Sequence, residues 1–331
     1  MKILVIRFSS IGDIVLTSPV LRCVSQQLGA EVHFLTKKTF VGLVQCNPYV
    51  SRVFGWGRSP AKIIALLRLQ RYDRVLDLHH NLRSWWVRQA LWRPARAFYK
   101  ANLEKWLLVH LGIDVMPDRH VVHRYLETAH PLGVHYDGQG LDYFIPAHEE
   151  VDVGRWEGPS TPYVAFVIGA HHATKRLPTD RAAELCRLIE SPVVLLGGPQ
   201  DTARAEEIAR LVGKKVFNAC GRLSLHQSAS VVRQANLVVT HDTGLMHIAA
   251  AFRRPIVSLW GNTVPRFGMY PFYPEGIDDR HLAFEVEGLP CRPCSKIGYE
   301  RCPKGHFRCM RDLELAAIAA AVNERYALFP P

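Results

Sequence analysis

The chain has 331 residues, of which 48% are hydrophobic, and its formal net charge is +11. This length and apolar content suffice for two ordinary domains with sizeable cores. No segment approaches the ~18 consecutive apolar residues of a transmembrane helix, and Met1-Lys2 leads directly into a β run without a basic leader or cleavage site, so we expect a cytoplasmic protein.

Apolar runs and turn residues divide the chain into two α/β halves. The first half predicts strands at 3–7, 32–36 and 74–78 and helices near 19–28, 60–70 and 83–92. Residues 137–162 lack a clear period and are predicted to be the linker. In the second half, strands at 163–168, 193–197, 215–218, 237–241 and 255–260 alternate with helices at 179–190, 201–212, 225–235 and 244–252, followed by a last helical stretch at 311–326. Such alternation predicts right-handed βαβ units and parallel sheets.

The first predicted strand ends at a polar loop that enters a helix. Its sequence is R-F-S-S-I-G-D, with Gly12 expected to permit a tight turn and Asp13 near the carboxyl end of the strand. Open α/β sheets place their chemistry at this edge. Asp13 is therefore a candidate reactive group, although it is also a candidate helix cap.

A second strand-loop-helix site lies at residues 240–251, T-H-D-T-G-L-M-H-I-A-A-A. A buried strand that ends at Asp242, turns through Thr243 and Gly244 and enters an Ala-rich helix surrounds one helix N-terminus with backbone N–H groups, a hydroxyl, a carboxylate and His247. A phosphate is favoured there. The alternative is that Asp242 caps the helix and His247 is a core histidine. Two such sites in two halves suggest a cleft between two domains.

Basic and aromatic residues are concentrated between Ser51 and Tyr125. This stretch holds 14 Lys and Arg against five acids, interleaved with Trp, Phe and Tyr. The composition suits an anionic membrane surface, a phosphorylated lipid or nucleic acid. A solvated charged surface over buried aromatic residues is the alternative.

Four cysteines cluster near the end of the chain in the pattern C-x2-C-x7-C-x3-H-x2-C. Cys291, Cys294, Cys302 and Cys309 are ligand types suited to structural zinc, but the spacing is not that of two C-x2-C knuckles. Buried thiols or an adventitious disulfide are the other interpretations.

Taken together, the motifs resemble those of the family 9 glycosyltransferases, the bacterial heptosyltransferases of lipopolysaccharide core synthesis. The resemblance rests on residues 1–20, K-R-L-P at 175–178, G-G-P-Q-D at 197–201, D-T-G-L-M-H at 242–247 and the cysteine cluster. It implies an α/β fold of GT-B architecture, with two Rossmann-like domains that face a central cleft. The implied domains are an acceptor-binding domain at 1–155, a donor-binding domain at 156–310, and a C-terminal helix at 311–331 that packs back toward the first domain.

The resemblance also implies roles for the donor-side residues. Lys175 matches the lysine that contacts the donor phosphates, Asp201 an acid near the ribose, and Asp242 the residue that binds sugar hydroxyls. Thr243 and Gly244 present groups to the phosphates, and His247 completes this set. Leu177 replaces a common Trp, and G-N-T-V-P at 261–265 replaces the common G-P-T-x-P form. Asp201 is equally well explained as a helix cap.

On the acceptor side, Asp13 would be the general base of an inverting displacement from ADP-heptose. Ser10, Gly12, Arg83 and Arg88 are the acceptor-side candidates, and the implied acceptor is the phosphorylated glycolipid lipid A-Kdo. No D-x-D pair occurs in the chain. Because a divalent ion would need carboxylates, the sequence predicts metal-independent transfer and no cofactor apart from the donor.

Two other functions stay open from the sequence alone. One is a nucleotide-sugar enzyme that uses a different sugar, within family 9 or with epimerase-like activity, and the other is a nucleic-acid-binding protein with a Cys/His zinc module. The leading interpretation expects a nucleotide-sugar donor, a glycolipid acceptor, peripheral contact with the inner membrane and no nucleic-acid partner. An oxidoreductase is disfavoured because no G-x-G-x-x-G follows the first strand.

Overall fold

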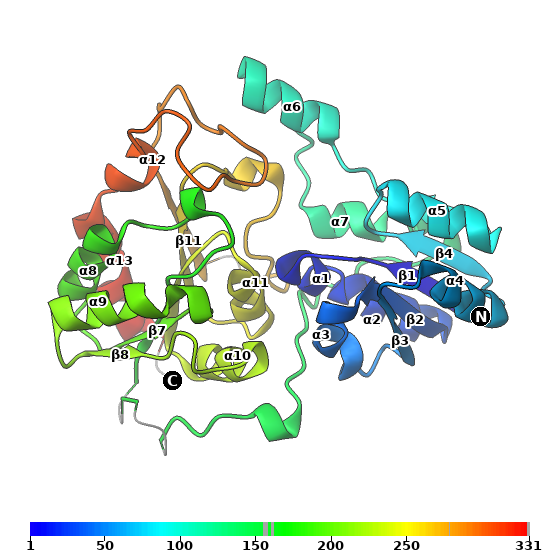
Figure 1. Ribbon diagram of the computed structural model, residues 1–331, viewed down its shortest axis with the longest axis horizontal. Coiled ribbons are helices and arrows are strands. Elements are labelled where there is room, and N and C mark those ends of the chain that lie inside the picture. Colours follow the sequence, from blue (N-terminus) through cyan, green and yellow to red (C-terminus); the bar gives the residue numbers. More distant parts are fainter. Residues whose placement is uncertain (155–157, 160–161, 278, 330–331) are drawn as a thin grey trace. The chain divides into compact units, whose positions relative to one another are not determined.

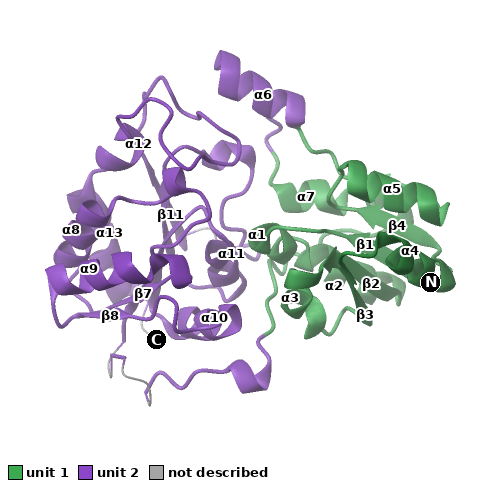
Figure 2. Ribbon diagram, in the orientation of Figure 1, with its two compact units in different colours: residues 1–101, 119–144 green, residues 102–118, 145–331 purple. Residues whose placement is uncertain are grey.

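The computed structural model describes residues 1–154, 158–159, 162–277 and 279–329 (Figure 1). It contains two compact units, each built around a parallel sheet (Figure 2). Residues 1–101 and 119–144 form the first unit, and residues 102–118 and 145–331 belong to the second.

The first sheet extends in both directions from its first strand. Its five strands are all parallel, in the order β3-β2-β1-β4-β5. They are β1 (Lys2–Ile6), β2 (Glu31–Lys37), β3 (Arg52–Trp56), β4 (Arg74–Asp77) and β5 (Ala95–Ala97). After Lys2, β1 is the apolar run I-L-V-I, and all four of these residues are buried, as expected of a central parallel strand. This order is that of a Rossmann-like sheet.

Six α-helices belong to this unit among the residues described. They are α1 (Ile11–Val15), α2 (Ser18–Leu28), α3 (Gly42–Gln45), α4 (Pro60–Leu69), α5 (Leu82–Leu91) and α7 (Val121–Leu126). α2 has Pro in its first turn and ends at Gly29 in the left-handed conformation, so both ends follow the usual termination rules.

The stretch after α7 is fastened to α2 by a buried arginine. Arg22 is 1% exposed, and its guanidinium pairs with Asp137 at 2.6 Å and with Asp142. These pairs hold the start of the predicted linker, residues 137–142, in the first domain. The predicted boundary at 155/156 and the linker residues 155–157 and 160–161 lie outside the described residues, and the unit changes between Phe144 and Ile145.

The second sheet repeats the same strand order with one strand more. Its parallel strands follow the order β11-β10-β9-β6-β7-β8. They are β6 (Val164–Val167), β7 (Val193–Leu196), β8 (Val216–Asn218), β9 (Leu237–His241), β10 (Ile256–Trp260) and β11 (His281–Glu285). Except for β8 and β11, every residue of these strands is buried.

The α-helices grouped with the second sheet, within the described part of the chain, include one from the first half of the sequence. They are α6 (Asn102–Leu111), α8 (Thr179–Leu188), α9 (Thr202–Val212), α10 (Leu225–Gln234), α11 (Gly244–Ala251), α12 (Arg308–Arg311) and α13 (Leu315–Leu328). Arg266 ties the α6 segment to this unit through Asp114 at 2.6 Å and Asp118 at 3.2 Å.

The C-terminal helix α13 packs on the sheet of the second domain; its predicted return toward the first domain stays a prediction. Leu315, Ile318 and Val322 are buried in the core of the second sheet, and α13 contacts α8, β9 and β10. The apolar residues recur at i, i+3 and i+7, so one stripe of the helix covers the sheet. Residues 330–331 of the predicted segment lie outside the described residues.

Most of the predicted regular elements appear within a few residues of their expected bounds. The sequence did not predict the strands β3, β5 and β11 or the helices α1, α3, α6, α7 and α12, and the predicted helix at 311–326 begins later, at Leu315. Nowhere in the described residues is there a helix whose length and hydropathy would let it span a bilayer.

Candidate active site

The first candidate site lies where the strand order of the first sheet reverses. β1 has β2 on one side and β4 on the other, with Ile6 in register with Asp77. The loops after β1 and β4 therefore leave the same sheet edge in adjacent positions, where doubly wound folds bind ligands. One loop leads to Asp13, and the other carries His79 and His80.

Both oxygens of Asp13 are engaged. Oδ1 lies 2.5 Å from Nη2 of Arg7. Oδ2 accepts hydrogen bonds from the backbone N–H of Ser10 at 3.0 Å and from its hydroxyl at 2.6 Å. Burial alone would raise the pKa of Asp13, but the Arg7 charge and the Ser10 hydrogen bonds outweigh it and lower the pKa to about 2.

Asp13 does have a capping role, as the alternative interpretation of the sequence expected. Asp13 is the third residue of α1 and forms a capping box with Ser10, rather than capping the helix that begins near Ser18. Gly12 lies buried inside α1 and has no positive φ, so the predicted tight turn is absent and the residue instead keeps the helix surface small.

A buried carboxylate organises the loop after β4. Asp77 is fully buried, and its Oδ1 accepts hydrogen bonds from the backbone N–H groups of His79 (3.0 Å) and His80 (2.8 Å). Its Oδ2 lies 3.2 Å from Nε of Arg88 on α5. Lys100 donates to the carbonyl of His80 at 3.3 Å. The loop is thereby held at several points.

The two arginines predicted on the acceptor side differ in their surroundings. Arg83 is exposed, and its guanidinium carbon lies 5.3 Å from the ring centre of Phe8, in the loop after β1. Arg88 is only 18% exposed at its side chain because it pairs with Asp77. Only Arg83 has the surface position expected of a ligand contact.

The second candidate site lies at the corresponding reversal of the second sheet. β6 has β7 on one side and β9 on the other, and Val167 is in register with Thr240. Lys175, after β6, reaches across to Asp242, after β9, with Nζ 2.5 Å from Oδ2. The hydroxyl of Thr263, after β10, donates to the same oxygen at 2.9 Å. Three loops therefore converge on the Asp242 carboxylate.

An open helix N-terminus adjoins this ion pair. Thr243 is the N-cap of α11 with extended backbone angles, and its side chain makes no capping hydrogen bond. The first N–H groups of α11 at Gly244 and beyond thus have no capping side chain, as in a phosphate-binding turn. His247 is 2% exposed and lies below the surface, as in the core-histidine alternative.

Asp201 occupies a structural position rather than a surface one. It is fully buried, its Oδ2 accepts from the N–H of Gly198 at 3.0 Å, and its Oδ1 lies 3.4 Å from Arg176. The glycines Gly169 and Gly197 leave room for this carboxylate. Asp201 is the N-cap residue of α9, but its side chain makes no capping hydrogen bond to that helix; it caps instead the 3-10 turn Pro199–Asp201 through Gly198. The ribose contact stays a prediction.

The predicted zinc candidates do not form a metal site in the part of the chain described. All eight cysteines are free thiols, and Cys291 Sγ lies 3.8 Å from Nε2 of His306. Burial raises the pKa of Cys309 to about 12 and also raises that of Cys294. No group of three or more His, Cys, Asp or Glu side chains among the described residues is arranged to hold a metal ion. Cys302, the remaining cysteine of the cluster, is also a free thiol and is not part of a metal site among these residues.

The family assignment follows from a match across most of the chain. Residues 61–299 match glycosyltransferase family 9 (heptosyltransferase). The chain belongs to this family. It is also similar to lipopolysaccharide heptosyltransferase 1 of Pseudomonas aeruginosa, with 27% identity, 89% of this chain and 86% of that protein covered.

Solved structures share the fold of this family 9 glycosyltransferase. The family 9 glycosyltransferase of Veillonella parvula has a TM-score of 0.77 at 18% identity, with 99% and 97% of the two chains covered. Escherichia coli heptosyltransferase WaaC with ADP has a TM-score of 0.70 at 20% identity, covering 98% and 100%. The two parallel-sheet α/β domains are those of the GT-B architecture.

Several site residues were not predicted from the sequence. Arg7 pairs with Asp13, and Thr263 donates to Asp242. His241 is fully buried, and its Nε2 accepts from the N–H of Leu177, which fixes the loop that carries Lys175. Burial, with Arg204 nearby, lowers the pKa of His241 to about 3, consistent with a neutral acceptor. The signal that could have identified them is a cationic or polar residue at the carboxyl end of a strand, where Arg7 follows β1, His241 ends β9 and Thr263 follows β10.

The Arg7 pair makes a pH-dependent contribution to stability. The pKa of Asp13 falls from its usual 3.8 to about 2, so the carboxylate contributes about 2 kcal/mol above pH 3.8, and this is lost as the pH falls toward 2. We expect Asp13→Asn, which is never charged, to unfold about 2 kcal/mol more easily near pH 6 and equally easily near pH 2. Denaturant unfolding across this range measures the difference.

The matched control for that series is Asp73→Asn, which replaces an exposed carboxylate that accepts one hydrogen bond from the backbone of Lys2. A loss at Asp13→Asn that stays constant down to low pH would contradict the role of the Arg7 pair.

The close fit around Asp201 predicts that Gly169→Ala is destabilising. An added Cβ would lie 2.4 Å from Oδ2 of Asp201 and 3.2 Å from the Cα of Gly197. Overpacking of this kind costs about 1–3 kcal/mol. Thermal unfolding compares it with Gly57→Ala, where a Cβ meets nothing within 4 Å. Equal unfolding temperatures for the two variants would contradict the prediction, because they would show that the loop carrying Asp201 shifts without cost.

Proposed function

We propose that this enzyme transfers heptose from ADP-heptose to the inner core of lipopolysaccharide, with lipid A-Kdo as acceptor and inversion at the anomeric carbon. The family assignment supports heptosyl transfer, and the relatives include a protein named lipopolysaccharide heptosyltransferase 1 and a heptosyltransferase solved with ADP. The observation that carries the proposal is the division of chemistry between the sheets. A carboxylate lies at the strand reversal of one, and a cation beside an open helix N-terminus lies at that of the other.

The donor diphosphate binds, in this proposal, at the N-terminus of α11. The N–H groups of Thr243 and Gly244 and the ammonium of Lys175 bind its oxygens, while Asp242 holds Lys175 and accepts from sugar hydroxyls. A lysine has three N–H donors; two are directed at the carboxylate and the carbonyl of Asp242, which leaves one for phosphate. His247, buried on α11, supports this turn from below, and Asp201, buried in the loop after β7, holds that loop rather than the ligand.

The proposed transfer is metal-independent. Charge that develops on the departing ADP is stabilised by Lys175 and by the helix N-terminus, both of which are fixed before the reaction begins. No D-x-D carboxylate pair is present in the sequence to bind a divalent ion for this purpose.

Asp13 is the proposed general base. It accepts the proton of the acceptor hydroxyl while that oxygen forms its bond to the anomeric carbon and the bond from carbon to the ADP oxygen breaks. Its pKa of about 2 keeps it ionised at neutral pH, and Arg7 and Ser10 fix its orientation. The low pKa makes it a weak base, so proton transfer occurs late, as the attacking oxygen becomes acidic.

The proposed acceptor surface is the basic, aromatic part of the first domain. Ser10 and Gly12 shape the loop beside Asp13, Arg83 contacts the anionic glycolipid, and Arg88 acts indirectly by holding Asp77. We also propose that the enzyme works in the cytoplasm, in peripheral contact with the inner membrane and without a nucleic-acid partner.

Lys175→Ala tests the donor site. We expect weaker ADP binding and lower turnover, each by about tenfold or more, because a phosphate contact acts in both the ground and the transition state. Isothermal titration with ADP, UDP and GDP and steady-state rates measure these effects. Lys214→Ala replaces an exposed lysine elsewhere in the same domain and is the control. Wild-type ADP affinity and rate at Lys175→Ala would remove this lysine from the site.

Asp13→Asn tests the base. Loss of a general base lowers turnover by about 10²–10⁴-fold, and ADP affinity should not change because the donor residues lie in the other domain. Rates at saturating acceptor, measured above pH 6 on protein verified as folded, decide the outcome. Near-normal turnover would make Asp13 purely structural, whereas Asp73→Asn should be as active as the wild type.

Arg83→Glu tests the acceptor contact. We expect a higher KM for the glycolipid and a weaker dependence of that KM on salt, with ADP binding unchanged, because an exposed ionic contact is screened. Arg222→Glu is the matched control, since Arg222 is also an exposed arginine but belongs to the second domain, away from the proposed acceptor surface. An acceptor KM that is the same in both variants and the wild type across a salt series would exclude an electrostatic role.

A further inference from the structure

The outer face of α5 exposes large apolar side chains. Leu82 is 86% exposed, Trp85 51% and Trp92 92%. These residues recur at i, i+3 and i+10, which places them along one side of the helix. Trp86 is also exposed, at 44%, but its ring additionally packs edge-on against the buried Trp56, with ring centres 5.9 Å apart. The exposed stripe therefore serves no packing purpose within the described first domain.

Trp92 has a backbone conformation that is unfavourable for a bulky residue. It ends α5 with φ 45° and ψ 53°, the left-handed conformation that favours glycine at a helix end. A bulky residue is strained there, and its indole is almost fully exposed, so no burial offsets the strain. A function at the surface accounts for a tryptophan at this position.

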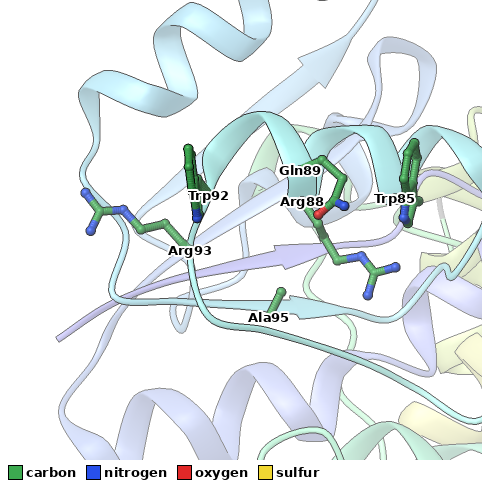
Figure 3. A pocket seen from close by; sticks show the side chains of 6 residues that line it. All are labelled: Trp85, Arg88, Gln89, Trp92, Arg93 and Ala95. Carbon is green, nitrogen blue, oxygen red and sulfur yellow. The ribbon is translucent and has the colours of Figure 1, made fainter.

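Between the two indoles lies a hollow of about 490 Å³, lined by Trp85, Arg88, Gln89, Trp92, Arg93 and Ala95. Figure 3 shows Trp85 and Trp92 at the two ends of α5, with Gln89 between them and the Arg93 guanidinium beyond Trp92. The volume lies within the range of small-molecule pockets, about 300–1,000 Å³. Its walls combine indole faces with cations, so it suits an anionic group that carries an apolar part.

The charge around this face is strongly one-sided. Residues 51–101 contain eleven Lys and Arg but only two acids, Asp73 and Asp77. Asp73 accepts a hydrogen bond from the backbone of Lys2, and Asp77 is fully buried beneath Arg88. The field outside α4 and α5 is therefore positive and is complementary to an anionic surface.

We propose that the outer face of α5, with the hollow between Trp85 and Trp92, is the surface on which the protein docks to a bilayer of anionic phospholipid. Indole rings are suited to the headgroup level, because one part is apolar and the N–H is polar. Arg93 and its neighbouring cations meet the lipid phosphates, and one headgroup occupies the hollow.

A bilayer fits this face better than nucleic acid does. Packed against α5, helix α4 adds exposed Leu66 (42%) and Leu69 (73%) to the apolar area formed by Leu82 and the indoles. Nucleic acid uses cations and aromatic rings but offers little to exposed aliphatic side chains, whereas the acyl region of a bilayer accepts them. The exposed leucines therefore favour an anionic bilayer over nucleic acid as the partner of this face.

This docking surface extends the proposed function. It rests on that function in one respect, namely that the acceptor is a glycolipid in a membrane. Docking at α5 needs neither donor nor acceptor, so vesicle binding and ADP binding can fail separately. The hollow also differs from the candidate site, whose reactive carboxylate is on α1.

The test is sedimentation of the full chain with vesicles that contain no glycolipid. Vesicles of phosphatidylglycerol and phosphatidylethanolamine are compared with neutral phosphatidylcholine, and ADP titration checks the fold of the second domain. We expect binding to the anionic vesicles only. The double change Trp85→Ser and Trp92→Ser should weaken it by about tenfold or more, and Arg93→Glu by about 25-fold, since each unit charge contributes roughly fivefold.

The matched control is Trp106→Ser on α6, which removes a tryptophan of similar exposure, 49%. It should bind like the wild type. Equal binding to neutral and anionic vesicles, or full binding by the double tryptophan variant whose circular dichroism is native, would overturn the proposal. Loss at Trp106→Ser alone would assign docking to α6 instead. An oligonucleotide that binds more tightly than the vesicles and depends on the same two tryptophans would identify the face as a nucleic-acid site.

Discussion

In a parallel sheet that grows in both directions from its first strand, the helix that follows that strand and the helix that follows its neighbour on the other side lie on opposite faces. The loops after that strand and after its neighbour then separate, and a gap opens between them at the carboxyl edge. Both sheets of this protein obey this constraint, at β1 and β4 and at β6 and β9. Asp13 and Lys175 both follow the strand at which the order reverses, so the topology determines where polar groups can gather without being covered by a helix.

At each reversal, a carboxylate and a cation form a nearly neutral pair, within one segment in the first domain and between two loops in the second. Arg7 with Asp13, and Lys175 with Asp242, are each joined at 2.5 Å. Such pairs lower the cost of placing charge where water is partly excluded, and they fix side chains that would otherwise lose rotamer freedom on binding a ligand. The chemistry is therefore organised before any substrate arrives, and the pairs also contribute to the stability of each domain.

The sequence predicted the elements that a local residue pattern defines, and it missed the elements and contacts that depend on which strands are neighbours in the sheet. Buried strands such as β1 and β9 are long apolar runs, whereas β5 is three exposed or half-buried residues that only pairing with β4 makes a strand. Motif matching identified Lys175 and Asp242 separately, but their contact requires β6 and β9 to be neighbours. The sequence left Asp201 open between a ribose contact and a cap, because a carboxylate after a glycine pair looks the same in sequence whether it faces a ligand or the interior.

Asp77 joins two parts of the first domain that have different tasks. One of its oxygens holds the backbone that follows β4, and the other holds α5 through Arg88. A fully buried carboxylate cannot exchange either partner for water without a large penalty. The helix and the loop are therefore coupled, so a force that seats α5 against an external surface is transmitted, through a single side chain, to the loop beside the proposed base.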